Sequence, residues 1–193
     1  MKIITKLLIL FVFVGVQNLS AQTEVSGITL PESRLNESEK SLELNGAGIR
    51  EKFWMDLYVA SMYVNTKNED AAFYISGKED ILMNLDIVSG LITSEKMYSA
   101  IDEGFGNSAK NPSNQLAGQI ETFKNLFSAE PIEKGDQFTF SFVVGQGTFV
   151  YKNKKEIALL EGADFQNALF GIWLGNKPAD KNLKKALLGQ AKK

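Results

Sequence analysis

The chain has 193 residues, of which 21 are basic and 23 acidic, and it contains neither histidine nor cysteine. Without cysteine there are no disulfides, thiol nucleophiles or thiolate metal sites, and without histidine the Ser–His and Cys–His triads and almost every zinc arrangement are excluded. Any chemistry must therefore come from Arg, Lys, Tyr, Asp, Glu, Ser or Thr. We expect no metal site and no cofactor.

Residues 1–21 have the layout of a secretory signal peptide. Lys2 and Lys6 precede an apolar run over residues 7–16, and a polar stretch then ends at Ala21. The run is too short for a permanent span, because a helix needs roughly 20 apolar residues to cross the bilayer core. The sequence predicts cleavage after Ala21 and a periplasmic or secreted protein with one domain over residues 22–193. The alternative is an uncleaved anchor.

The expected mature chain is mildly acidic. It keeps 19 basic and 23 acidic side chains, which gives a formal net charge of −4. Nucleic acid and anionic membranes are recognised through basic stripes, so we expect neither as a partner. The length is sufficient to bury one full hydrophobic core.

Strand-like patterns come first along the chain. Residues 41–44 alternate and run into the turn-prone stretch 45–48. Residues 53–64 are apolar on both faces, as in a central strand, and residues 80–87 alternate. Helical spacing then predicts one helix over residues 97–105, opened by Thr93 or Ser94, and another over residues 116–127.

The second half of the chain continues with a hairpin and two helices. Residues 137–144 and 148–152 flank a Gly-Gln-Gly turn. One helix follows a capping Asp164 and extends to Trp173, and the last begins at Asp180 and stops at Gly189. Because strands and helices are grouped rather than alternating, the class is α+β, with an antiparallel sheet and helices packed on one face.

Two motifs have simple structural interpretations. Gly46-Ala47-Gly48 lacks the third glycine of a dinucleotide-binding loop and precedes a strand rather than a helix, so it offers no helix N-terminus to a pyrophosphate. Its glycines instead favour a close backbone approach. The adjacent acids Glu79 and Asp80 point apart on any regular element, and we expect them to be solvated.

Arg50 is the most informative single residue. A guanidinium at the edge of an apolar strand can hold a carboxylate through two parallel hydrogen bonds. Tyr58 lies eight residues later, which is roughly 26 Å along a straight strand, so the two side chains can share a ligand only if the chain turns near Glu51-Lys52. The simpler alternative is a surface arginine paired with a glutamate.

Two segments resemble the chalcone isomerase-like family. Residues 44–64, which contain Gly46-Ala47-Gly48-Ile49-Arg50, are similar to its Gly-Ala-Gly-x-Arg strand pair, and residues 164–189 are similar to its paired C-terminal helices. The resemblance covers roughly residues 25–189 and is closest to the short, exported bacterial branch. It implies an open-faced β-sandwich in which a ligand cleft lies between an antiparallel sheet and the helices on one of its faces.

The resemblance also implies positions in that cleft. Arg50 matches the substrate-holding arginine of the plant isomerases, and Tyr58 stands where they have a threonine. The Tyr-x-Glu-Lys helix motif reads Thr93-Ser-Glu-Lys96, and Ala100 replaces an asparagine, so two isomerase groups are lost.

An arginine with a tyrosine is what the fatty-acid-binding members of this fold use to grip a carboxylate. The arginine supplies charge and a fork of donors, and the tyrosine hydroxyl adds a third donor. We therefore expect Arg50, Tyr58, Thr93 and Lys96 to bind the ligand. Its apolar tail would run between the sheet and the helices that carry Phe123 and Ile172.

Three functions stay open at this point. The first is a non-catalytic binding protein for a fatty acid or a similar amphipathic carboxylate, for which Arg50 and Tyr58 are the expected clamp. The second is an isomerase or lyase acting on a phenolic substrate. The third is a ligand-free interaction module of the cell envelope, because one fold hosts many functions.

Overall fold

The computed structural model describes residues 23–128 and 130–190, so the predicted signal peptide lies outside the described residues. The strands are β1 (Thr23–Val25), β2 (Ile28–Leu30), β3 (Ser33–Leu35), β4 (Ser41–Lys52), β5 (Met55–Val64), β6 (Ile81–Ile87), β7 (Gln137–Val143), β8 (Gly147–Lys152) and β9 (Lys155–Leu160). The helices are α1 (Ala71–Ile75), α2 (Ser94–Ser108), α3 (Asn114–Leu126), α4 (Ala163–Leu174) and α5 (Lys181–Leu187).

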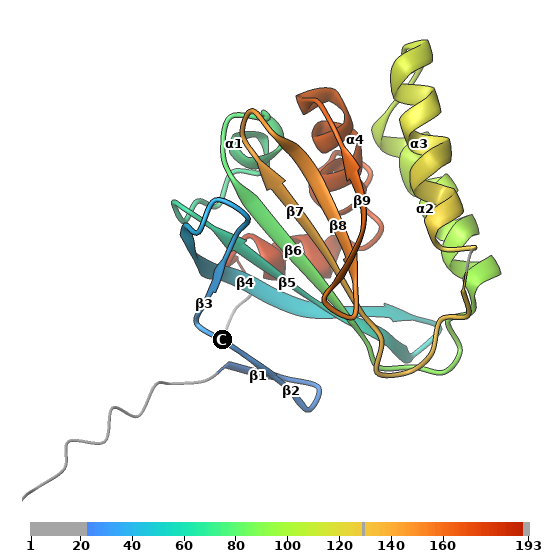
Figure 1. The fold of residues 1–193 in the computed structure, drawn as a ribbon. Helices are drawn as coiled ribbons and strands as arrows, with labels where there is room; N and C mark the ends of the chain where they lie inside the picture. The colour runs from blue at the N-terminus through green and yellow to red at the C-terminus, as the bar shows by residue number, and fades with distance from the viewer. Residues whose placement is uncertain (1–22, 129, 191–193) are drawn as a thin grey trace, which may run out of the picture.

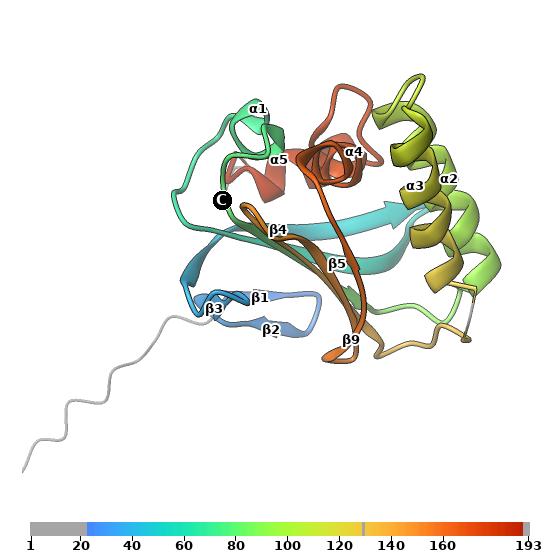
Figure 2. The ribbon, with the colours of Figure 1, turned by 45° about the horizontal axis from the view of Figure 1, so that its top comes forward.

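The main sheet is a curled antiparallel meander whose seven strands follow chain order from β3 to β9 (Figure 1). β1 and β2 pair separately. The helices pack on one face of the sheet, and the β1–β2 hairpin lies on the other side (Figure 2). This architecture confirms the expected α+β class and the antiparallel sheet with helices on one face.

β5 is the strand buried on two sides that its sequence predicts, but it begins at Met55, because Phe53 and Trp54 form the turn before it. Ala60, Met62 and Val64 point into the large core shared with the helices, whereas Tyr63 points to the opposite face and packs with Leu42. Every residue from 58 to 64 is buried. The apolar character of both faces therefore reflects two separate hydrophobic clusters.

The predicted turn at residues 45–48 is wrong, because this stretch continues β4 with one irregularity between Leu44 and Gly46. The glycines serve a different purpose. A Cβ on Gly46 would lie 2.0 Å from the carbonyl oxygen of Ala186, and one on Gly48 would lie 2.7 Å from the Ala186 Cβ. The absence of side chains thus lets α5 rest directly on β4, as expected of glycines at a close backbone approach.

Two further expectations need correction. Asp164 does not cap α4, because the cap position is Gly162 and Asp164 lies in the first turn. Asp80 is 4% exposed rather than solvated, and its carboxylate accepts hydrogen bonds from Asn36 Nδ2, Lys40 Nζ and the Val144 amide. These partners come from loops whose folding the local pattern does not reveal.

Replacing Gly46 with alanine should destabilise the protein, because the new Cβ would push α5 away from β4. We expect the free energy of unfolding to fall by about 1–3 kcal/mol, as at other overpacked sites. The matched control is Gly118→Ala in α3, where the position is open and alanine should raise stability by about 0.5–1 kcal/mol. Urea denaturation measures both changes, and equal effects would contradict the close contact.

Candidate functional site

Arg50 and Tyr58 are direct cross-strand partners in the β4–β5 hairpin. The chain reverses at Phe53 and Trp54, whose φ angles of 53° and 61° are both left-handed. This turn is slightly later than Glu51-Lys52, but it meets the condition for the two side chains to cooperate. Partners on one face of an antiparallel pair have Cβ atoms about 4.5–5.5 Å apart, so both side chains are close enough to contact one small ligand group.

The Tyr58 hydroxyl is buried beneath α4. It accepts a hydrogen bond of 2.9 Å from Trp173 Nε1, and the tyrosine is 8% exposed. Burial raises the pKa of Tyr58 above its usual value, against the opposing effects of the Trp173 hydrogen bond and the Arg50 charge, and the Asp180 charge raises it further. The phenol is therefore neutral at neutral pH. Within residues 23–128 and 130–190 its own O–H has no acceptor, so it can donate to a ligand.

Arg50 is already paired with a carboxylate. Its Nη1 lies 3.1 Å from Asp180 Oδ2 and donates to the Glu51 carbonyl oxygen at 2.7 Å. The side chains of Arg50 and Asp180 are 21% and 16% exposed, so the pair borders solvent. The guanidinium has five N–H donors, and in the described part of the chain Nε and Nη2 have no hydrogen-bond partner. The partner is thus an aspartate rather than the glutamate of the simpler alternative.

Asp180 is held in place by the start of α5. Its Oδ1 accepts hydrogen bonds from the amides of Asn182 and Leu183, at 2.7 and 3.0 Å, which is the geometry of an N-cap. One carboxylate therefore caps the helix with one oxygen and neutralises Arg50 with the other. The helix that packs on Gly46 and Gly48 is the element that delivers this charge to the site.

Thr93 and Lys96 are not brought to Arg50 or Tyr58 by any hydrogen bond or ion pair among the described residues. Thr93 Oγ1 accepts from the Lys96 amide and caps α2, and Lys96 Nζ donates to the Leu91 carbonyl oxygen at 3.0 Å. Their expected role in ligand binding gains no support from this geometry.

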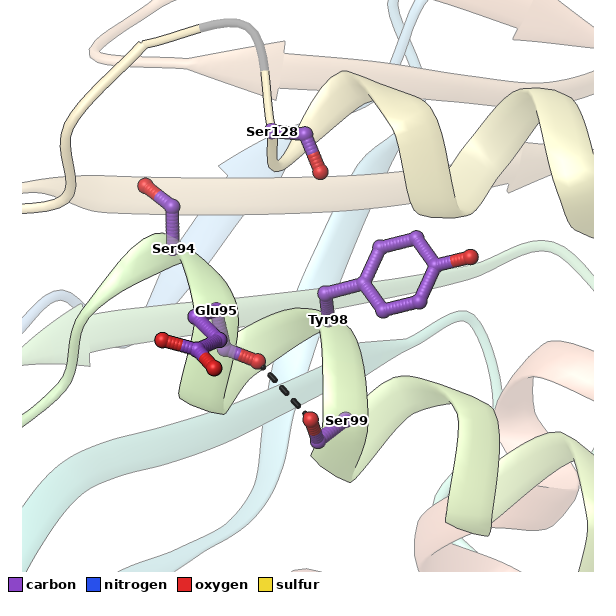
Figure 3. Close-up of a pocket in the computed structure, with 5 residues that line it drawn as sticks. All are labelled: Ser94, Glu95, Tyr98, Ser99 and Ser128. Carbon is purple, nitrogen blue, oxygen red and sulfur yellow. Dashed lines mark hydrogen bonds between the residues drawn. The ribbon is translucent and has the colours of Figure 1, made fainter.

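Thr93 instead borders an open hollow of about 450 Å³ at the start of α2. An adjoining hollow of about 420 Å³ lies over the first turns of the same helix (Figure 3). Both are lined by Ser94, Glu95 and Ser128. Because Glu95 is the charged side chain they share, neither hollow is suited to a carboxylate.

The space between the sheet and the helices is filled by side chains. Phe123 packs against Phe127, Phe140 and Phe165, with ring centroids 5.1, 5.5 and 5.6 Å apart. Ile172 is 5% exposed and packs against α2, where its Cγ2 lies 2.8 Å from the position that a Cβ on Gly104 would take. The open tail cleft expected beside Phe123 and Ile172 is thus occupied by the core, and Ile172 is a helix-packing residue here.

Sequence reasoning placed Trp173 in an apolar stripe and Asp180 at a helix start, and missed that both reach the Arg50–Tyr58 pair. For Trp173 one signal was available in the sequence. A tryptophan in an apolar stripe is expected to be buried, and a buried indole N–H usually donates to an acceptor. We call Arg50, Tyr58, Trp173 and Asp180 the clamp. No group of three Asp or Glu side chains suited to a metal occurs among the described residues, and none of the described helices is long and apolar enough to span a bilayer.

Comparisons with known proteins show what this chain resembles in sequence and in fold. A family model described as chalcone isomerase-like matches residues 22–189. Among solved structures, the fold is similar to a fatty-acid binding protein of Arabidopsis thaliana, with a TM-score of 0.67, 18% sequence identity, and coverage of 84% of this chain and 92% of that one. The comparison with curated proteins gives no match.

Tyr58→Phe should lower the free energy of unfolding by about 1–3 kcal/mol at neutral pH, because it leaves the buried Trp173 N–H without an acceptor. The difference from wild type should shrink at alkaline pH. A raised pKa means that the neutral phenol is favoured in the folded state, so this stabilisation is complete below the unfolded value near 10 and is lost as the pH rises through the folded pKa.

Urea denaturation of both proteins from neutral pH to about pH 11 measures this trend. Burial raises the pKa of Tyr74 to about 12 and also raises that of Tyr151, and both residues are present in wild type and variant. Their contributions cancel in the difference, which isolates Tyr58. A difference that stays constant with pH would contradict a buried, neutral Tyr58.

Proposed function

This chain belongs to the chalcone isomerase-like family, and from that premise we propose that it is an exported, non-catalytic protein that binds a fatty acid or a similar amphipathic carboxylate. The observation that carries the proposal is the placement of Arg50 opposite Tyr58, with donors on both side chains that no described residue accepts from. The name of the Arabidopsis protein supplies the same ligand class for a protein of this fold.

Carboxylate recognition is the chemistry that this pair performs best. The free Nε and Nη2 of Arg50 form one edge of a planar fork, and charge-assisted bonds from such a fork are roughly twice as strong as neutral ones. The Tyr58 hydroxyl adds a donor from the neighbouring strand. The Tyr58 side chain is buried, so little conformational freedom is lost when its hydroxyl engages a ligand.

Asp180 occupies part of the position that a ligand carboxylate would take. A bound carboxylate either replaces its contact with Nη1 or uses the remaining edge of the guanidinium. In the first case one ion pair is exchanged for another, so the head group contributes orientation more than affinity. The apolar tail then supplies most of the binding free energy, at about 0.8 kcal/mol for each buried methylene.

Trp173 lies between the clamp and the aromatic core. Its indole donates to Tyr58 and its ring stacks on Phe140 at a centroid distance of 5.8 Å. A tail entering between the sheet and the helices would have to displace this ring first. We therefore assign Trp173 as the side chain that separates the head-group site from the tail site.

Binding without turnover follows from the groups beside Arg50. Tyr58 has a raised pKa, so it stays protonated and is a poor base at neutral pH. The Asp180 carboxylate is engaged by Arg50 through one oxygen and by the amides of Asn182 and Leu183 through the other. Thr93 and Lys96, the positions that the isomerase pattern would use, have local hydrogen bonds within their own helix and the loop before it. The clamp offers recognition of charge rather than acid–base chemistry.

Isothermal titration with dodecanoic acid and its methyl ester tests the clamp. Arg50→Ala should weaken binding of the acid by about 1.5–3 kcal/mol and Tyr58→Phe by about 0.5–1.5 kcal/mol, with little effect on the ester. Asp180→Asn should strengthen binding of the acid by up to about 1 kcal/mol, because asparagine keeps the helix cap while releasing Arg50. If wild type binds acid and ester alike, or Arg50→Ala binds the acid as wild type does, the clamp proposal is wrong.

Export is tested by the N-terminus of protein isolated from the cell envelope or the medium. We expect the mature chain to begin at Gln22, because the polar stretch after the apolar run ends at Ala21. Edman sequencing or intact mass reads the terminus directly. A protein that still carries Met1 would contradict cleavage and leave an anchored or internal form.

A further inference from the structure

The β4–β5 hairpin ends in an aromatic tip, which we define as Phe53, Trp54 and Met55. These side chains are 72%, 97% and 41% exposed. Phe53 and Trp54 occupy the two central positions of a two-residue turn in which both φ angles are positive. Such turns strongly favour Asn-Gly, so two bulky aromatic residues here are conformationally costly.

Contacts within the molecule do little to offset the conformational cost of this turn. Among the described residues, the tip makes one cation–π contact, in which Lys52 Nζ lies 5.8 Å from the centroid of the Phe53 ring. Costly conformations that persist at a surface point to a role outside the fold.

The size and chemistry of the aromatic tip indicate what kind of surface it contacts. Three side chains are far fewer than the roughly 20–30 residues with which each protein contributes to a stable interface. Tryptophan, which is the most exposed residue of the tip, is enriched at the membrane–water interface of proteins that contact bilayers. The flanking charges have no basic excess, since Glu51 and Lys52 precede the tip, Asp56 follows it, and all three side chains are exposed. An apolar contact with little electrostatic preference therefore fits best.

We propose that the aromatic tip inserts into the headgroup region of a lipid bilayer and docks the protein peripherally. Arg50 precedes Phe53 by three residues, about 10 Å along a strand, so the docked protein would hold the clamp close to the membrane surface. That link rests on the proposed function, because a fatty acid partitions into the bilayer and would be collected there. The docking itself needs no ligand.

The two tryptophans of the chain make docking visible, because Trp54 is almost fully exposed whereas Trp173 is 5% exposed. The test uses protein processed at residue 22, since the apolar run of the leader would itself bind lipid. Added phosphatidylcholine vesicles should shift the tryptophan emission to the blue and shield it from acrylamide. An equal share of phosphatidylglycerol and added salt should change this little.

The decisive variant combines Phe53→Asn with Trp54→Gly. It supplies the residues that the turn prefers, so the protein should fold at least as well as wild type. Vesicle cosedimentation should weaken at least about tenfold, which is the loss expected when one aromatic side chain no longer leaves water. The control is Leu35→Ser. Leu35 is 68% exposed and lies on β3 opposite Ser41, at the end of β4 that is far from the tip, so this change should not affect cosedimentation.

Wild-type protein that does not bind vesicles, or a double variant that binds them as wild type does, overturns the proposal. Concentration-dependent dimerisation that the double variant abolishes, without vesicle binding, also overturns it and assigns the tip to contact between two copies. Dodecanoate titration in solution should be the same for the double variant and wild type. A failure of docking therefore leaves the clamp result intact, and a failure of the clamp leaves the docking result intact.

Discussion

The antiparallel register of β4 and β5 is the constraint on which the site depends. It places Arg50 opposite Tyr58, and the same turn projects Phe53 and Trp54 away from the sheet. A shift of one residue would move Arg50 to the other face of the sheet and separate it from Tyr58, because side chains alternate along a strand. The hairpin therefore sets both the recognition chemistry and its distance from the exposed tip.

The second half of the chain completes the clamp through α5. Because Gly46 and Gly48 carry no side chain, α5 lies directly on β4, and its capping Asp180 reaches Arg50. The aspartate neutralises a guanidinium that would otherwise be partly buried and unpaired, which is costly. A carboxylate ligand bound as proposed would have to compete with this internal carboxylate for Arg50.

The space between the sheet and the helices is filled by the core, and this bears on the proposed ligand binding. The rings of Phe123, Phe140 and Phe165 are packed between the sheet and the helices, and Trp173 closes their edge next to Tyr58. The tail of a ligand bound as proposed would have to displace side chains rather than enter an existing space. Affinity would then depend on how readily Trp173 leaves Tyr58, which couples the head-group site to the tail site.

The sequence by itself determined where most strands and helices lie and which side-chain chemistry is available. A run that is apolar on both faces located β5, period-two patterns located β6 to β8, and helical spacing and capping residues located α2 to α5, because these signals are local. The lack of histidine and cysteine narrowed the possible chemistry. The motif around Arg50 also carried the family resemblance. What only the tertiary structure decided was which distant residues meet. The turn at Phe53–Trp54 lacks the Asn-Gly signal, so the opposition of Arg50 and Tyr58 could only be stated as a condition.

The same physical reason explains the errors. Thr93 and Lys96 were assigned to the site by analogy, yet local capping bonds hold them elsewhere. Asp180 was recognised as a helix start but not as the partner of Arg50, since the two are 130 residues apart and their contact depends on how closely α5 packs on β4. Periodicity specifies the face that a residue takes on its own element. The packing of elements against each other specifies what that face touches.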